Sequence, residues 1–121
     1  MPKKILIIDD QLYITRLLTF VLEKEGFECH TAQSGEEGLE KLIKIRPHAV
    51  ILDVIMPTLD GYEVCRRIRN NPETKHTYVV MLTTLAGEEN KNKGLSAGAN
   101  EYITKPFSPS KVIAHLKEVL K

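Results

Sequence analysis

The stretch PKKILIIDDQ, residues 2–11, contains an apolar run at positions 5–8 that ends directly on two aspartates. Similar short runs occupy residues 49–52, 78–82 and 102–103. Apolar runs of about 4–6 largely β-branched residues, without alternation, indicate strands that are buried on both faces of a sheet. A fifth run, at residues 28–32, contains polar and small residues and is typical of a strand at a sheet edge.

Helical patterns lie between these runs. An apolar stripe at 3.6-residue spacing covers residues 14–22, and a third helical pattern covers residues 62–68. Ser34 followed by Glu37 is a capping-box signature and predicts the start of a second helix. The last helix is predicted to start at Ser108, which a proline follows at the first turn.

Strand and helix therefore alternate five times without a linker or an internal repeat. This alternation predicts an α/β fold with a single doubly wound (βα)5 domain over residues 1–121. The common solution at this size is a flavodoxin-like, five-stranded parallel sheet in the order 2-1-3-4-5. The segment 87–98 is the weakest helix of the five, because two asparagines and Gly94 lie inside it and it has little apolar stripe.

The composition excludes several classes of protein. The chain has 121 residues, of which 42% are hydrophobic and 27% charged, as in ordinary soluble globular domains. The net charge of +1 gives no strong basic field, so we expect no direct binding of nucleic acid. The apolar run near the N-terminus is too short for a signal peptide or a membrane span, which predicts a cytoplasmic protein without membrane contact. Cys29 and Cys65 fit no metal or redox spacing and are interpreted as packing residues.

Polar residues end four of the apolar runs: Asp9 and Asp10, Asp53, Thr83, and Lys105. Parallel strands end at one edge of the sheet, where doubly wound folds bind their ligands, so these side chains are expected to converge. Crowded carboxylates repel one another unless a cation lies between them, and hard oxygen ligands favour Mg²⁺. A carboxylate can also act as a nucleophile towards phosphorus, with a metal, an ammonium and a hydroxyl stabilising the phosphoryl oxygens.

No glycine-rich phosphate loop of the GxxxxGK[ST] or GxGxxG type occurs in the sequence. We therefore expect the phosphoryl donor to be a phosphoprotein or a small acyl phosphate rather than a bound nucleotide.

Four blocks of the sequence resemble the signature motifs of response-regulator receiver domains, the phosphoacceptor modules of two-component signalling. They are IIDDQ at 7–11, ILDVIMPTLDGYEV at 51–64, VVMLTT at 79–84 and AGANEYITKPF at 97–107. The resemblance covers essentially the whole chain. It implies Mg²⁺-dependent phosphoryl transfer to Asp53 from a sensor histidine kinase or a histidine phosphotransfer protein. It also implies a metal site formed by Asp9, Asp10, Asp53 and the backbone carbonyl of Ile55.

The same resemblance assigns roles at the other strand ends. Thr83 matches the hydroxyl that contacts the phosphoryl group, and Lys105 matches the lysine that precedes a cis-proline, here Pro106. Tyr102 matches the switch aromatic. The face formed by residues 87–98 (helix 4), residues 102–103 (strand 5) and the helix that starts at Ser108 (helix 5) is implied to switch and is a candidate surface for a homodimer. Thr84 is a departure, because many members have alanine there, and we expect it to narrow access to the phosphoryl pocket.

Four other interpretations are open from the sequence. Asp9 and Asp10 alone could cap a helix, and Tyr102 could be only a core residue. The chain could be a phosphorylation-independent interaction module (a pseudo-receiver), but that would require the loss of an acidic residue or Lys105. It could be a metal-dependent phosphohydrolase, but no spare histidine or glutamate ends a strand. We therefore predict a signalling phosphoacceptor rather than an enzyme acting on small substrates.

Overall fold

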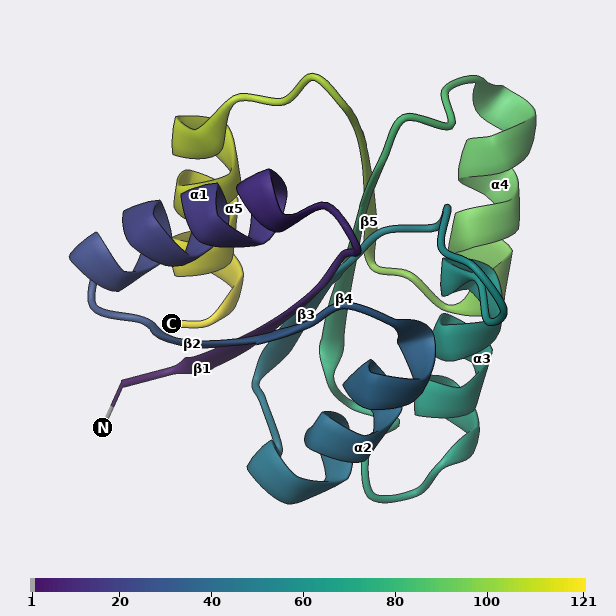
Figure 1. Cartoon of the computed structure of the whole chain (residues 1–121), viewed down its shortest axis with the longest axis horizontal. Helices are drawn as coiled ribbons and strands as arrows, with labels where there is room; N and C mark the ends of the chain where they lie inside the picture. Colours follow the sequence, from purple (N-terminus) through teal and green to yellow (C-terminus); the bar gives the residue numbers. More distant parts are fainter. Residues whose placement is uncertain (1) are drawn as a thin grey trace.

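The computed structural model describes residues 2–121 and is built around one parallel sheet. Its strand order is β2-β1-β3-β4-β5, which confirms the predicted doubly wound topology (Figure 1). The five strands are β1 (Lys4–Ile8), β2 (Glu28–Ala32), β3 (Ala49–Leu52), β4 (Tyr78–Thr83) and β5 (Glu101–Thr104). Each strand lies within one or two residues of its predicted bounds, and the apolar runs of β1, β3 and β4 are buried on both faces, as expected.

Helices cover both faces of the sheet. Two of them pack on one face and three on the other, with an apolar cluster beneath each layer (Figure 1). The first layer consists of α1 (Leu12–Lys24) and α5 (Pro109–Val119), and the second of α2 (Gly35–Ile45), α3 (Gly61–Asn70) and α4 (Glu88–Ala97). The β1 strand pairs with both β2 and β3, so the chain reverses its winding direction between β1 and β3. This switch point is where a doubly wound sheet opens a crevice.

Local capping agrees with the sequence. The Ser34 hydroxyl accepts a hydrogen bond from the Glu37 backbone N–H at 3.1 Å, as the capping signature predicts. The Glu37 carboxylate accepts from the backbone N–H of Gln33, one residue before the cap, at 2.8 Å. Ser108 caps α5 in the same way through the backbone N–H of Lys111. Because each cap satisfies a free N–H group, the helices start where the sequence places them.

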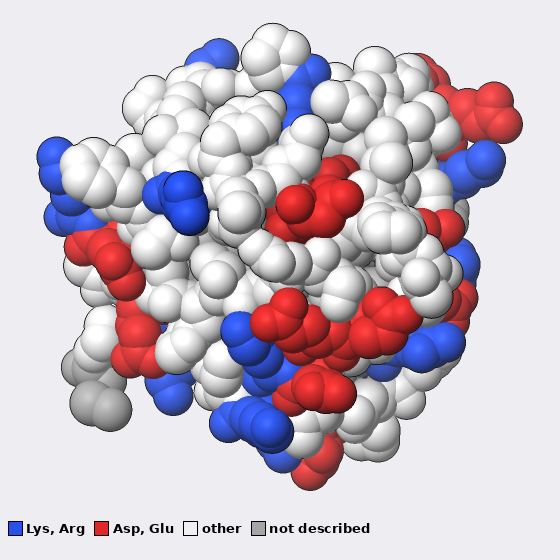
Figure 2. Space-filling model, in the orientation of Figure 1, with Lys and Arg blue, Asp and Glu red and all other residues white. Residues whose placement is uncertain are grey.

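Both cysteines are free thiols with packing roles, as expected. Cys65 is fully buried in the cluster under α2–α4, and Cys29 is half-buried against the cluster under α1 and α5. Both acidic and basic side chains occur on the face seen in Figure 2. Within residues 2–121, none of the helices combines the length and apolar character needed to cross a bilayer.

Candidate functional site

Three carboxylates meet at the switch point of the sheet. Asp9 and Asp10 directly follow β1, and Asp53 directly follows β3, the neighbouring strand. One oxygen from each of the three lies within 4.8 Å of the others. Asp9 and Asp53 are only 2% and 5% exposed, whereas Asp10 is exposed to solvent. Three acidic groups that are distant in sequence therefore form one cluster.

The backbone fixes the two buried carboxylates. The Asp9 N–H donates to the Ala32 carbonyl and the Asp53 N–H to the Ile8 carbonyl, each at 3.0 Å, so both residues prolong the sheet ladder. The Asp9 carboxylate accepts from the Gln11 N–H at 2.9 Å. Gln11 is itself the N-cap of α1 and makes no side-chain capping bond. The aspartate pair is therefore not the helix cap that it could have been from sequence alone.

Lys105 reaches into the cluster from the end of β5. Its Nζ donates to Asp9 Oδ2 at 3.0 Å and to Asp53 Oδ2 at 3.4 Å, and its side chain is only 7% exposed. The Lys105–Pro106 peptide bond is cis, as the resemblance implies. A third acceptor is Gln11 Oε1, at 3.0 Å from the ammonium. Sequence reasoning missed Gln11, although its position directly after the aspartate pair was a usable signal.

The charges in the site depend on one another. Burial raises the pKa of Asp9 above its ordinary value, and the Asp53 charge adds to this, while the Gln11 N–H and Lys105 act in the opposite direction. For Lys105, burial works to lower the pKa, but the hydrogen bond to Asp9 and the charges of Asp53 and Asp9 outweigh it and raise the pKa. Lys105 is therefore held as a cation at neutral pH, but a single ammonium does not relieve the crowding of three carboxylates.

This donor set fits Mg²⁺. It offers hard carboxylate oxygens from the three aspartates at a partly open position, which leaves room for the waters that Mg²⁺ retains. A hollow of about 160 Å³ opens over the cluster, lined by Asp10, Gln11, Asp53, Ile55, Thr84 and Lys105. The hollow is large enough for a phosphoryl group and a few waters.

The two threonines at the end of β4 are placed differently. Thr83 is fully buried, and its hydroxyl accepts from the Leu85 N–H at 3.3 Å, so Thr83 does not line the hollow. Thr84 is exposed and does line it, at the position where we expected it to narrow access. Ile55 also lines the hollow and is half-exposed.

Tyr102, the predicted switch aromatic, points inward. Its ring is only 8% exposed, and its hydroxyl donates to the Leu85 carbonyl in the β4–α4 loop at 2.6 Å. Leu85 also donates its N–H to Thr83, so a short chain of contacts joins Thr83 to Tyr102. The tyrosine is thus a core residue with a polar attachment to the loop that follows Thr83.

Gly61 keeps the start of α3 close to the site. A Cβ atom at this position would overlap the Asp53 carbonyl oxygen and lie 2.7 Å from Val54 Cα. The Gly61 N–H donates to the Val54 carbonyl at 2.9 Å, which ties the helix to the segment after the aspartate. Glycine at position 61 therefore allows the start of α3 to lie against the backbone of Asp53 and Val54, in addition to its role in the turn.

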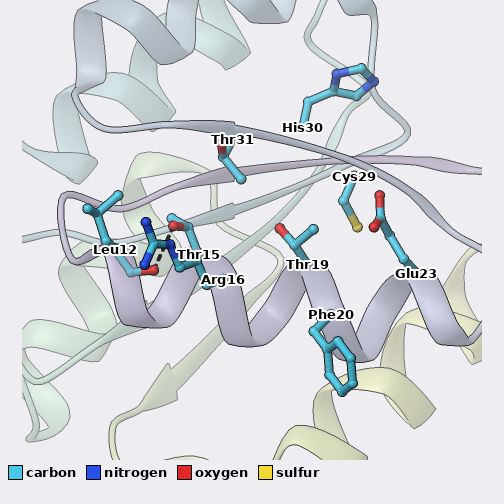
Figure 3. Close-up of a pocket in the computed structure, with 9 residues that line it drawn as sticks. All are labelled: Leu12, Thr15, Arg16, Thr19, Phe20, Glu23, Cys29, His30 and Thr31. Carbon is cyan, nitrogen blue, oxygen red and sulfur yellow. Dashed lines mark hydrogen bonds between the residues drawn. The ribbon is translucent and has the colours of Figure 1, made fainter.

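A larger groove lies away from the acidic cluster, between α1 and the edge strand β2 (Figure 3). Its volume is about 540 Å³. In Figure 3, Thr15 and Thr19 of α1 face Thr31 and Cys29 of β2 across the groove, whereas His30 points away. The groove holds no cluster of acidic groups, so its size does not make it the site of phosphoryl chemistry.

This fold and site define a response-regulator receiver. The family model of the response regulator receiver domain matches residues 5–117, and the chain belongs to this family of signalling phosphoacceptors. All the residues whose loss would indicate a pseudo-receiver are present, namely Asp9, Asp10, Asp53 and Lys105.

Curated proteins that are similar in sequence support the family assignment. The chain is 43% identical, over its full length, to the alkaline phosphatase synthesis transcriptional regulatory protein PhoP of Bacillus subtilis, of which it covers 50%. It is 42% identical over 98% of its length to the transcriptional regulatory protein ResD of the same organism, of which it covers 48%. The chain therefore spans about half the length of these curated relatives.

Solved structures show the same fold. The chemotaxis protein CheY4 of Vibrio cholerae superposes with a TM-score of 0.92 at 34% identity, covering 98% of this chain and 99% of that one. The BeF3-activated receiver domain of DrrB, from Thermotoga maritima, superposes with a TM-score of 0.91 at 36% identity, covering 99% and 98%.

Proposed function

We propose that Asp53 is the phosphoacceptor of this receiver, and that its donor is a sensor histidine kinase or a histidine phosphotransfer protein. The observation that carries the proposal is the position of Asp53. It lies in the acidic cluster with Lys105 at 3.4 Å, at the floor of the hollow that opens to solvent. A phosphohistidine side chain can approach only from that open side.

The transfer exchanges one bond for another. A carboxylate oxygen of Asp53 attacks the phosphorus atom, the bond from phosphorus to the donor imidazole nitrogen breaks, and the imidazole leaves with the electron pair of that bond. Lys105 is already an ion-pair partner of Asp53 and would move its ammonium onto a phosphoryl oxygen. The Thr83 hydroxyl would turn from the Leu85 N–H to a second oxygen.

Asp9, Asp10, Asp53 and the Ile55 carbonyl are the groups proposed to hold Mg²⁺. When bound, the ion neutralises the acidic cluster and stabilises charge on a phosphoryl oxygen. Burial raises the pKa of Asp9, so a cation bound beside it would stabilise its ionised form.

The conformational output is proposed to run through Thr83 and Tyr102. Movement of Thr83 towards the phosphoryl group would break its contact with Leu85, the residue that holds the Tyr102 hydroxyl. Such a change would shift the equilibrium between two arrangements of the β4–α4 loop and of the face formed by α4, β5 and α5. That face is the proposed surface for a target or for homodimerisation. The two free cysteines support a reducing compartment, the cytoplasm, as the place of action.

Mass spectrometry after incubation with acetyl phosphate and Mg²⁺ tests the site. The wild type is expected to gain one phosphoryl group, and Asp53→Asn none. Asp60→Asn is the matched control, since Asp60 is a carboxylate that caps α3 outside the cluster, and it should be labelled like the wild type. Labelling of Asp53→Asn, or undiminished labelling of the wild type in excess chelator, contradicts the proposal.

A further inference from the structure

Few contacts hold α4 on the sheet. Only Gly94 and Ala97 of this helix are buried, and its N-cap, Gly87, makes no side-chain capping bond. No basic residue in its last turn complements the helix dipole. Contacts from neighbouring elements therefore decide where this helix lies.

Tyr62 provides one such contact from α3. Its hydroxyl donates to the Asn90 carbonyl in the first half of α4 at 3.2 Å. The α3 helix is itself well anchored, with Val64, Cys65 and Ile68 fully buried. The phenol of Tyr62 thus links a fixed helix to a loosely held one.

The Tyr102 ring lies under the same helix. It is packed so closely against Gly94 that no Cβ would fit there, and its hydroxyl bonds the Leu85 carbonyl just before α4. Burial, together with the nearby Tyr62 hydroxyl, raises the pKa of the Tyr102 phenol, so Tyr102 stays protonated and able to donate. The ring can remain buried only while α4 stays in place above it.

We propose that Tyr62 is a positioning residue of the switch, whose hydrogen bond to the Asn90 carbonyl holds α4 over the buried Tyr102 ring. The inference rests on the proposed function in one respect: it takes Tyr102 as the switch aromatic. It adds that the balance between the inward and outward positions of Tyr102 is set partly from α3. The Tyr62 hydroxyl is the group that sets it, and phenylalanine at this position would lack that group.

Tyr62→Phe tests the proposal, with Tyr78→Phe as the matched control. Tyr78 also has a hydroxyl hydrogen bond, at 2.8 Å to His115 Nε2, but it contacts α5 rather than α4. Amide hydrogen exchange is measured in the unphosphorylated proteins, in residues 91–94 to follow local opening of α4 and in residues 5–8 to follow global unfolding, which the loss of either hydroxyl hydrogen bond favours. The net contribution of one such bond corresponds to about a fivefold change in an equilibrium constant.

The exchange rate of α4, compared with the wild type, should rise about fivefold in Tyr62→Phe and remain unchanged in Tyr78→Phe, whereas residues 5–8 should exchange faster in both variants. In the same sample, the NMR signals of the Tyr102 ring should shift towards a solvent-exposed environment. The inference is overturned if α4 of Tyr62→Phe exchanges at the wild-type rate, or if Tyr78→Phe loosens α4 as much.

Labelling with acetyl phosphate separates this inference from the proposed function. Tyr62→Phe retains the whole acidic cluster and is expected to be phosphorylated on Asp53 like the wild type. If neither protein takes up label, the assignment of Asp53 fails, but the exchange comparison still decides the role of Tyr62.

Discussion

The substitution Gly94→Ala has two opposing effects on stability. It improves the helix propensity of α4, but it crowds the contact between α4 and Tyr102. Alanine is favoured over glycine in a helix interior by about 1 kcal/mol, so helix propensity by itself would stabilise α4. The added Cβ, however, would lie 2.7 Å from Tyr102 Cδ2 and 2.8 Å from Met81 Sδ, both in buried side chains. Overpacking of this kind costs about 1–3 kcal/mol. The net change is therefore expected to be a loss of about 0–2 kcal/mol in the free energy of unfolding.

The position of Tyr102 is the more informative observable. Met81 is fully buried in the interior strand β4, whereas the Tyr102 ring can turn outward or α4 can shift. NMR of protein with isotope-labelled tyrosine should show a changed chemical shift for the Tyr102 ring. Urea unfolding measures the change in the free energy of unfolding.

Asn92→Ala is the control, because Asn92 is exposed in the same helix and its replacement should stabilise by about 0.5 kcal/mol without moving Tyr102. The packing argument is refuted if Gly94→Ala is about 1 kcal/mol more stable than the wild type and the Tyr102 signal is unchanged.

Three further predictions concern the acidic cluster. Lys105→Ala should still be phosphorylated by acetyl phosphate, but roughly a hundredfold more slowly, and phosphorylation should no longer change its affinity for a partner; an unaltered response in a binding assay would contradict the coupling role. Ile55→Asn combined with Leu85→Glu should speed loss of the phosphoryl group about tenfold at fixed Mg²⁺, because polar side chains there can orient the attacking water; an unchanged rate would leave Thr84 as the next residue to test. Because burial raises the pKa of Asp9 above 3.8, its contribution to stability is present below that pH and is lost as the pH rises through the raised value. Asp9→Asn in excess chelator should therefore gain stability relative to the wild type between about pH 4 and pH 7, and equal pH profiles in denaturation would count against the raised pKa.

The fold and the acidic cluster could both be predicted from the sequence, because both follow from the positions of the buried strands. Runs such as residues 5–8 and 49–52 are apolar on both faces, which only a covered parallel sheet satisfies, and the residues that follow them must emerge at one edge. Asp9, Asp10, Asp53 and Lys105 are brought together by topology alone, so their convergence follows once the strands are recognised.

Other features depend on side-chain packing that no local pattern encodes. The sequence marks Gly94 as a weak point of a helix, but its absent side chain makes room for Tyr102 and Met81, which come from other strands. It marks Tyr62 only as an apolar position of α3, whereas the folded chain directs its hydroxyl to α4.

The sequence by itself determined the order of elements, the sheet topology and the edge at which the acidic cluster lies, because periodicity and strand-end residues are local properties. The tertiary structure alone decided that Gln11 bonds Lys105, that Thr84 rather than Thr83 lines the hollow, and that Tyr102 is turned inward. These outcomes depend on which rotamers fit among neighbours far away in the chain, and that choice is made only when the core packs.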